Sequence, residues 1–251
     1  MWRGGRLHRN RRRASRLRAP GARSLLCSGG HGGSNVSDDE RLSYASPPCF
    51  LHELEPGFRP AESAEWRDVA RWRKAERERL IEARLAISAE TRASFAGMIA
   101  EGLDAAIGAV GGRIVSVYWP FRGEPDLRPW LASVVERGGR AALPVVVEKA
   151  KPLTFRAYGP GDPLEKGVWN IPIPAKGEPV VPDVVIAPVV GFDPGRYRLG
   201  YGGGFFDRTL AALPRKPLII GVGYDMQAIP TIYAQAHDIP MDRIVTQNGA
   251  R

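Results

Sequence analysis

The chain has 251 residues, of which 43% are hydrophobic and 25% charged, and its formal net charge is +9 at pH 7. A chain of this composition can form one domain of about 190 residues with a sizeable core. No apolar run reaches the roughly 18 residues of a membrane-spanning helix, so we expect no membrane partner. The two cysteines form no metal-binding pattern and the four histidines are scattered, which argues against a zinc site and favours a reducing, cytoplasmic location.

The positive charge is concentrated at the N-terminus. Residues 1–37 contain nine arginines, no lysine and no acidic residue, so subtracting nine from +9 leaves residues 38–251 with a formal charge of zero. We expect a basic disordered tail over 1–37, an irregular proline-containing lead-in over 38–62, and one folded domain over 63–251. The tail fits an extension without function, an organelle-targeting segment if the source is eukaryotic, or, least of all, a nucleic-acid-binding arm.

The folded part begins with two predicted helices. The first covers about 64–86, and Ser88 is placed to cap a second that ends near Ile107. Seven lysines and arginines lie in the first helix among several glutamates, and the ordinary explanation is a solvated charged face. Arg73 and Arg77 are four residues apart and therefore share one side of this helix.

A short strand follows over 114–118. Pro125 suits the first turn of a next helix, which extends to about Glu136. Glu124 then lies near the carboxyl end of the strand, where open α/β sheets bind ligands, unless it only caps the helix. Trp119 and Phe121 would supply an apolar wall there or belong to the core.

The remaining elements alternate between strands and helices. Strands are predicted over 141–147, 153–158, 184–190 and 217–223, an extended segment over 169–174, a loop over 176–182, and a helix over 205–213. This order is typical of the α/β class. We expect a single doubly wound sheet domain with helices on both faces, preceded by an irregular N-terminal extension.

The most informative stretch is Gly191 to Leu210, GFDPGRYRLGYGGGFFDRTL. A glycine-rich turn between a strand and a helix brings backbone N–H groups up to an anionic phosphate, because glycine allows close approach. Arg198 can add charge-assisted hydrogen bonds, and Asp207 offers an oxygen suited to Mg²⁺. The loop matches neither common phosphate-binding fingerprint, and a merely flexible connection is the alternative.

The whole stretch resembles the signature of the 5-formyltetrahydrofolate cyclo-ligase family, in which G-F-D and then R-L-G-x-G-x-G-[YF]-[YF]-D form the ATP and folate loop. WNIPIP from Trp169 to Pro174 and HDIPMDRIVT from His237 to Thr246 extend this resemblance, which covers about residues 70–248. It implies ATP-dependent closure of 5-formyltetrahydrofolate to 5,10-methenyltetrahydrofolate through phosphorylation of the formyl oxygen, with release of ADP and phosphate.

The resemblance also implies roles for individual residues. Arg198 and Asp207 would be catalytic, and Asp207 with Asp242 would hold the cofactor Mg²⁺. The folate side would be formed by Trp119, Glu124, Trp169 and Phe205. The family's first helix, K-x-x-x-R…R-x-x-[IL]-S, leaves Lys74 as a one-residue alternative to Arg73. The residues implied to contact ATP are Arg73, Lys74, Arg77, Arg198, Gly200, Tyr201, Gly202, Gly203, Gly204, Phe205 and Phe206.

Several residues depart from the family's usual pattern. They are Tyr201, Gly203, Phe205 and Phe206 in the loop, and Pro125 and Leu127 after Glu124. A divergent relative that binds ATP or folate without this activity is therefore an alternative. A non-enzymatic protein that acts through residues 1–37 on nucleic acid is a third. The expected partners are ATP and a reduced folate, and we do not expect nucleic acid.

Overall fold

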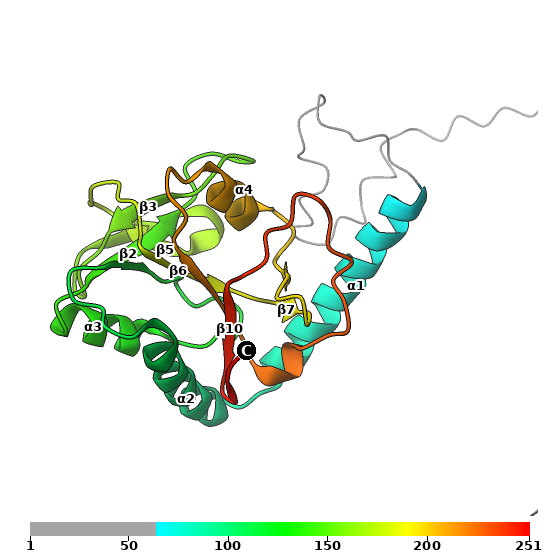
Figure 1. The fold of residues 1–251 in the computed structure, drawn as a ribbon, viewed down its shortest axis with the longest axis horizontal. Coiled ribbons are helices and arrows are strands. Elements are labelled where there is room, and N and C mark those ends of the chain that lie inside the picture. Colours follow the sequence, from blue (N-terminus) through cyan, green and yellow to red (C-terminus); the bar gives the residue numbers. More distant parts are fainter. Residues whose placement is uncertain (1–63) are drawn as a thin grey trace, which may run out of the picture. The chain divides into compact units, whose positions relative to one another are not determined.

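The structure, a computed structural model, describes residues 64–251 (Figure 1). The predicted tail over 1–37 and the lead-in over 38–62 lie outside the described residues, so these predictions and the domain boundaries stay predictions. The described chain forms an α/β fold around a seven-stranded sheet with the strand order β11-β10-β9-β6-β1-β2-β3. Its strands are β1 (Ile114–Ser116), β2 (Arg140–Val145), β3 (Thr154–Ala157), β6 (Val184–Pro188), β9 (Leu218–Val222), β10 (Arg243–Thr246) and β11 (Gly249–Ala250).

The central strands of the sheet are parallel. β10, β9, β6, β1 and β2 pair in parallel, whereas β3 and β11 are antiparallel edge strands. The winding reverses between β1 and β6, because β1 leads outward to β2 and β6 leads outward to β9 and then β10. The segments that follow β1 and β6 therefore meet at a topological switch point, where open α/β sheets bind ligands.

Helices cover both faces of the sheet, as predicted. α2 (Ala89–Ile107) and α3 (Arg128–Glu136) pack on one face, and α4 (Phe205–Ala212) packs on the other (Figure 1). This arrangement follows because successive side chains of a strand point to opposite faces of the sheet. In β6, Val184 and Ile186 join the core under α2 and α3, while Val185 and Ala187 face the side covered by α4.

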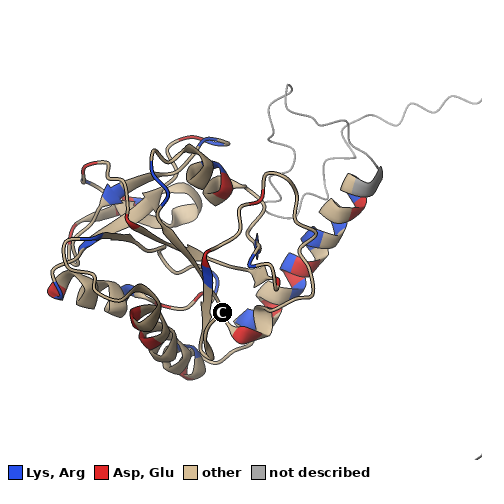
Figure 2. Cartoon of the chain, viewed as in Figure 1, with Lys and Arg blue, Asp and Glu red and all other residues tan. Residues whose placement is uncertain are grey.

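The first helix, α1 (Ala64–Leu85), combines a charged surface with a small buried stripe. Basic and acidic residues alternate along its length (Figure 2), and exposed pairs such as Arg71 with Asp68 form the predicted solvated face. Leu80 and Ile81 are buried against the segments around β7 (Gly191–Phe192), β8 (Arg198–Leu199) and residue 232. No helix among the described residues is long and apolar enough to cross a membrane.

Most of the predicted elements are confirmed, and Ser88 caps α2 by accepting a hydrogen bond from the Thr91 amide (3.1 Å). The helix start at Pro125 was wrong. α3 begins at Arg128 with Pro129 in its first turn, and its N-cap is Leu127. Pro129 fits there because its fixed φ suits a first turn that needs no amide hydrogen. Glu124 therefore does not cap this helix.

The segment Trp169–Pro174 is only partly extended. Residues Val168–Asn170 form a short 3-10 turn in which Trp169 (φ 57) and Asn170 (φ 58) are left-handed, and β5 (Pro172–Pro174) follows. β5 pairs with β4 (Leu164–Lys166) in a small antiparallel sheet, and β7 (Gly191–Phe192) pairs with β8 (Arg198–Leu199) in another. These two ribbons were not predicted, because strands of two or three residues carry no readable period.

Candidate active site

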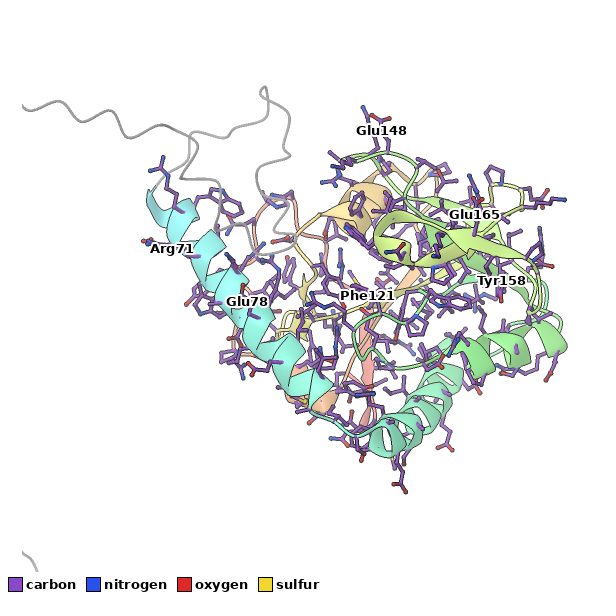
Figure 3. All side chains as sticks on the ribbon, turned by 180° about the vertical axis from the view of Figure 1, so that it is seen from behind. Arg71, Glu78, Phe121, Glu148, Tyr158 and Glu165 are labelled. Atoms are coloured by element: carbon purple, nitrogen blue, oxygen red, sulfur yellow. The ribbon has the colours of Figure 1, made fainter. Side chains whose placement is uncertain are left out.

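A cavity of about 560 Å³ lies at the carboxyl ends of β1 and β6. It is lined by α1, the segment after β1, the β4–β5 ribbon, the glycine loop, the first turn of α4 and residues 237–238. In Figure 3, Phe121 lies between the sheet and α1, which carries Glu78; both residues line the cavity. Every residue predicted for the site lines this cavity except Asp242.

The glycine loop needs its glycines for two reasons. Gly202 (φ 101) and Gly204 (φ 60) have positive φ values, which glycine adopts without steric cost. At Gly200, a Cβ atom would lie 2.6 Å from Nη1 of Arg198. Gly204 is also the N-cap of α4 and offers no capping side chain. The loop can therefore turn its backbone toward the cavity and present the first amides of α4 to an anion.

Arg198 and Asp207, both predicted for the site, form an ion pair at the cavity that was not predicted from the sequence. Arg198 Nη2 donates to Asp207 Oδ2 (2.7 Å), and the guanidinium lies 5.0 Å above the ring of Phe206. The Arg198 side chain is 5% exposed, yet its Nε has no hydrogen-bond partner within the described part of the chain. A buried donor without a partner costs about 1–3 kcal/mol, so this atom is suited to a ligand acceptor.

Arg73 and Lys74 of α1 differ in whether their charged groups already have partners in the described part of the chain. Arg73 donates to the carbonyls of Ile232 (2.8 Å) and Tyr233 (2.9 Å) and to Asp238 Oδ2 (2.6 Å). Arg73 therefore ties α1 to the segment 232–238. Lys74 lines the same cavity, and no described residue forms an ion pair or hydrogen bond with its ammonium group. Of the two alternatives, Lys74 is the cation free to meet a phosphate.

Arg77 supports the glycine loop from α1. Its Nε donates to the carbonyl oxygen of Gly200 (2.7 Å), and its guanidinium carbon lies 3.5 Å from where a Gly202 Cβ would be. The structure thus brings Arg77 and the loop together across 123 residues of sequence. A positive charge beside the loop favours an anionic ligand.

Glu124 lies on the other side of the cavity and is buried. Its Oε2 accepts from the Phe121 amide (2.9 Å), and its Oε1 accepts from the Tyr201 hydroxyl (2.9 Å). Arg84 Nη1 lies 4.0 Å from Oε1. Burial raises the pKa of Glu124 to about 7, while the Arg84 charge, the Phe121 amide and the Tyr201 hydroxyl act in the opposite direction.

Arg84 was not predicted as a site residue, although it is the last arginine of the R-x-x-[IL]-S pattern. Its side chain is fully buried. The sequence does not reveal this burial, because Arg84 is one of seven lysines and arginines in α1 and its type alone predicts an exposed side chain. Asp238, the partner of Arg73, also lines the cavity and was not singled out.

Aromatic side chains form the remaining wall. Trp119, Phe121, Trp169 and Phe205 are half-buried cavity residues. Trp169 packs edge-on against Phe205 with 6.0 Å between ring centroids, which joins the β4–β5 ribbon to α4. Since these rings are not enclosed in the core, they can offer their faces to a planar ligand.

Asp242 does not lie beside Asp207. Its Oδ1 accepts from Lys216 Nζ (2.9 Å) and its Oδ2 from the Ile219 amide (2.8 Å), at the start of β9. That is the amino end of the parallel strands, whereas the cavity lies at their carboxyl ends. The described residues contain no group of three His, Cys, Asp or Glu side chains able to hold a metal ion. We therefore retain only Asp207 for the predicted Mg²⁺ site.

Comparison with known proteins agrees with the sequence resemblance. Residues 69–247 match the 5-formyltetrahydrofolate cyclo-ligase family. A Mycolicibacterium smegmatis protein named 5-formyltetrahydrofolate cyclo-ligase is 34% identical over 148 residues, which are 55% of this chain and 75% of that protein. The Escherichia coli K12 protein of the same name is 35% identical over 139 residues, 53% of this chain and 76% of that one.

Solved structures show the same fold. The NMR structure of Aquifex aeolicus 5,10-methenyltetrahydrofolate synthetase has a TM-score of 0.63 and 28% identity, and the match covers 71% of this chain and 91% of that one. A 5,10-methenyltetrahydrofolate synthetase from Mycoplasma pneumoniae has a TM-score of 0.57 at 22% identity, covering 70% and 98%, and supports the fold alone. Together with the match over residues 69–247, these findings assign the chain to the 5-formyltetrahydrofolate cyclo-ligase family.

Proposed function

We propose that this chain closes 5-formyltetrahydrofolate to 5,10-methenyltetrahydrofolate at the expense of ATP. The observation that carries the proposal is one cavity with two chemically different sides. One side has the glycine loop with Arg77, Lys74 and Arg198, which suits polyphosphate. The other side has half-buried aromatic rings and the buried carboxylate of Glu124, which suits a planar heterocycle with N–H donors.

The chemistry requires that the two ligands lie side by side. The formyl oxygen attacks the γ-phosphorus of ATP, and the bond from this phosphorus to the ADP oxygen breaks. The N10 amine of the folate then attacks the formyl carbon, the bond to the phosphate oxygen breaks, and the amine proton leaves. Phosphate is a far better leaving group than the oxygen of a formamide, so the ring closes.

The residues of the chain would act by positioning and by charge. Arg198 and the amides of Gly202 to Gly204 would stabilise the charge that develops on the transferring phosphoryl group. Lys74 and Arg77 would hold the remaining phosphates. Trp169 and Phe205 would keep the folate against the nucleotide, which lowers the barrier to both steps by proximity.

Magnesium fits this site as an ion bound together with the phosphates of ATP. Mg²⁺ is commonly bound by one or two carboxylates together with substrate phosphates and water. Asp207 is the carboxylate that would hold it, although it also pairs with Arg198. When bound, the ion neutralises phosphate charge.

The direct test is an absorbance assay for methenyltetrahydrofolate with the full chain, 5-formyltetrahydrofolate, ATP and Mg²⁺. Asp207→Ala should lose about 100-fold or more in kcat, in the range seen when an electrostatic group of the transition state is removed. Asp68→Ala removes an exposed ion pair on α1 and should leave the rate unchanged. A wild-type chain that binds ATP but forms no product would favour the divergent relative.

A further inference from the structure

Three side chains from distant parts of the chain form a continuous line of hydrogen bonds; Arg84 and Glu124 are buried and Tyr201 is half-buried. Arg84 Nη2 donates to the Tyr201 hydroxyl (2.6 Å), and this hydroxyl donates to Glu124 Oε1 (2.9 Å). Arg84 is further held by the carbonyls of Arg122 (3.0 Å) and Val189 (3.4 Å). The line thus joins the end of α1, the glycine loop and the segment after β1.

The chemistry of arginine determines the direction of this line. A guanidinium stays protonated in proteins and has no acceptor, so Arg84 must donate to the Tyr201 oxygen. The single hydroxyl proton of Tyr201 is then directed toward Glu124. Glu124 Oε1 must accept it, and Oε2 already accepts from the Phe121 amide. Both carboxyl oxygens therefore act as acceptors, which is the arrangement of an ionised carboxylate.

We propose that Arg84 and Tyr201 are positioning residues that hold Glu124 as an oriented, hydrogen-bond-accepting carboxylate. This proposal rests on the proposed function, since Glu124 is there the group that binds the folate ring. It also assigns Tyr201 two tasks: its backbone belongs to the nucleotide loop, while its side chain serves the folate side. The glycine loop would then link the two halves of the cavity.

The ionisable groups that interact with Glu124 are buried, except Tyr201, which is half-buried. Arg84 comes from α1, Tyr201 from the glycine loop, Tyr118 from the end of β1 and Tyr224 from the segment after β9. Burial raises the pKa of the Tyr201 hydroxyl, so it stays protonated and able to donate. The Tyr201 hydroxyl lowers the pKa of Glu124 against the effect of burial, so the loss of this donor should raise that pKa.

The test uses Tyr201→Phe, which removes the hydroxyl and keeps the ring. Tyr197→Phe is the matched control, because Tyr197 is also half-buried and packs in the same hydrophobic cluster as Tyr201, while the hydroxyl that donates to Glu124 belongs to Tyr201. The side-chain carboxyl carbon of Glu124 is titrated by ¹³C NMR in the full chain, and its signal is identified by its loss in Glu124→Gln. The pKa of Glu124 should rise in Tyr201→Phe and stay unchanged in Tyr197→Phe.

Kinetics provide the second measurement. In Tyr201→Phe, the KM for 5-formyltetrahydrofolate at pH 7 should rise by about tenfold, the cost of one hydrogen bond to a charged group, while the KM for ATP stays within twofold. The acid side of the kcat/KM profile should move to higher pH. In the Glu124→Gln background, Tyr201→Phe should add little, since the carboxylate is already gone.

Arg84 is tested in the same way. Arg84→Lys keeps a positive charge and should retain more folate affinity than Arg84→Gln. The proposal would be overturned if Glu124 had the same pKa in wild type and in Tyr201→Phe. It would also be overturned if Tyr201→Phe raised the KM for 5-formyltetrahydrofolate and the KM for ATP by the same factor. If the wild-type chain forms no methenyl product but Glu124 still titrates at higher pH in Tyr201→Phe, the positioning role stands and the proposed function fails.

Discussion

Two carboxylates in one cavity have opposite surroundings. Asp207 belongs to the first turn of α4 and forms a direct ion pair with Arg198 (2.7 Å), with its side chain 15% exposed. Glu124 is 2% exposed, and its nearest cation, Arg84, lies 4.0 Å away behind the Tyr201 hydroxyl. The first is built for strong charge interactions at the cavity, and the second for recognition by hydrogen bonds in a low-dielectric environment.

The difference bears on how one cavity would accept the two unlike ligands of the proposed function. A phosphate chain needs many donors and a place for a metal ion, which the arginines, the lysine and the loop amides would supply on the proposed nucleotide side. A heterocycle with N–H groups needs one oriented acceptor, which the carboxylate of Glu124 would supply on the proposed folate side. Each prediction below changes one side and leaves the other intact.

The largest effect is expected from Arg198→Ala. Removing an arginine beside a transferring phosphoryl group typically costs about 10³-fold or more in kcat. The KM for 5-formyltetrahydrofolate should change little, because Arg198 belongs to the nucleotide side. Arg215→Ala, which removes an exposed ion pair with Asp183, is the control. Steady-state kinetics with both substrates measure this, and a kcat within threefold of wild type would exclude a catalytic role for Arg198.

The neighbouring cations Arg73 and Lys74 should separate stability from binding. Arg73→Ala removes the ion pair with Asp238 and the donors to the Ile232 and Tyr233 carbonyls, and should lower the free energy of unfolding by about 3 kcal/mol. Lys74→Ala should leave stability unchanged and raise the KM for ATP. Urea unfolding and ATP kinetics are measured on both variants. If Arg73→Ala raised the KM for ATP without loss of stability, and Lys74→Ala did not raise it, Arg73 would be the residue that contacts phosphate.

The raised pKa of Glu124 predicts a pH dependence with a definite sign. The folded protein binds this proton more tightly than the unfolded chain does, because the pKa rises from 4.5 to about 7. The resulting stabilisation is fully present below pH 4.5 and is lost as the pH rises through 7, in total about 3 kcal/mol. Glu124→Gln should lack this loss in unfolding curves between pH 5 and 8. If the free energy of unfolding changed equally with pH in wild type and Glu124→Gln, the pKa of Glu124 would not be raised in the folded protein.

The smallest effect is expected at the loop backbone. Gly202→Ala places a Cβ on a residue with φ 101, which costs about 1–3 kcal/mol of local strain. The KM for ATP should rise by about tenfold, and the ¹³C titration of Glu124 should stay as in wild type. If the titration of Glu124 moved as well, the strain would have spread from the loop to the Tyr201 hydroxyl.

Local patterns were enough for much of the fold and for half of the site. The helix from Ala64, the cap at Ser88 and the glycine loop before α4 were all predicted from neighbouring residues, because capping, periodicity and positive φ are short-range properties. Arg198 and Asp207 are nine residues apart on either side of the loop, and both were predicted for the site. Family resemblance supplied the chemistry.

Only the tertiary structure decided the rest. The Arg84 to Tyr201 bond spans 117 residues and the Tyr201 to Glu124 bond spans 77, and no local pattern encodes which buried groups will meet. Asp242 was assigned to the metal by its motif, but the sheet directs it to the amino end of β9. The sequence by itself determined the elements and the glycine loop, whereas the packing of α1 against the segments that follow β1 and β6 determined which charges are buried and which groups they contact.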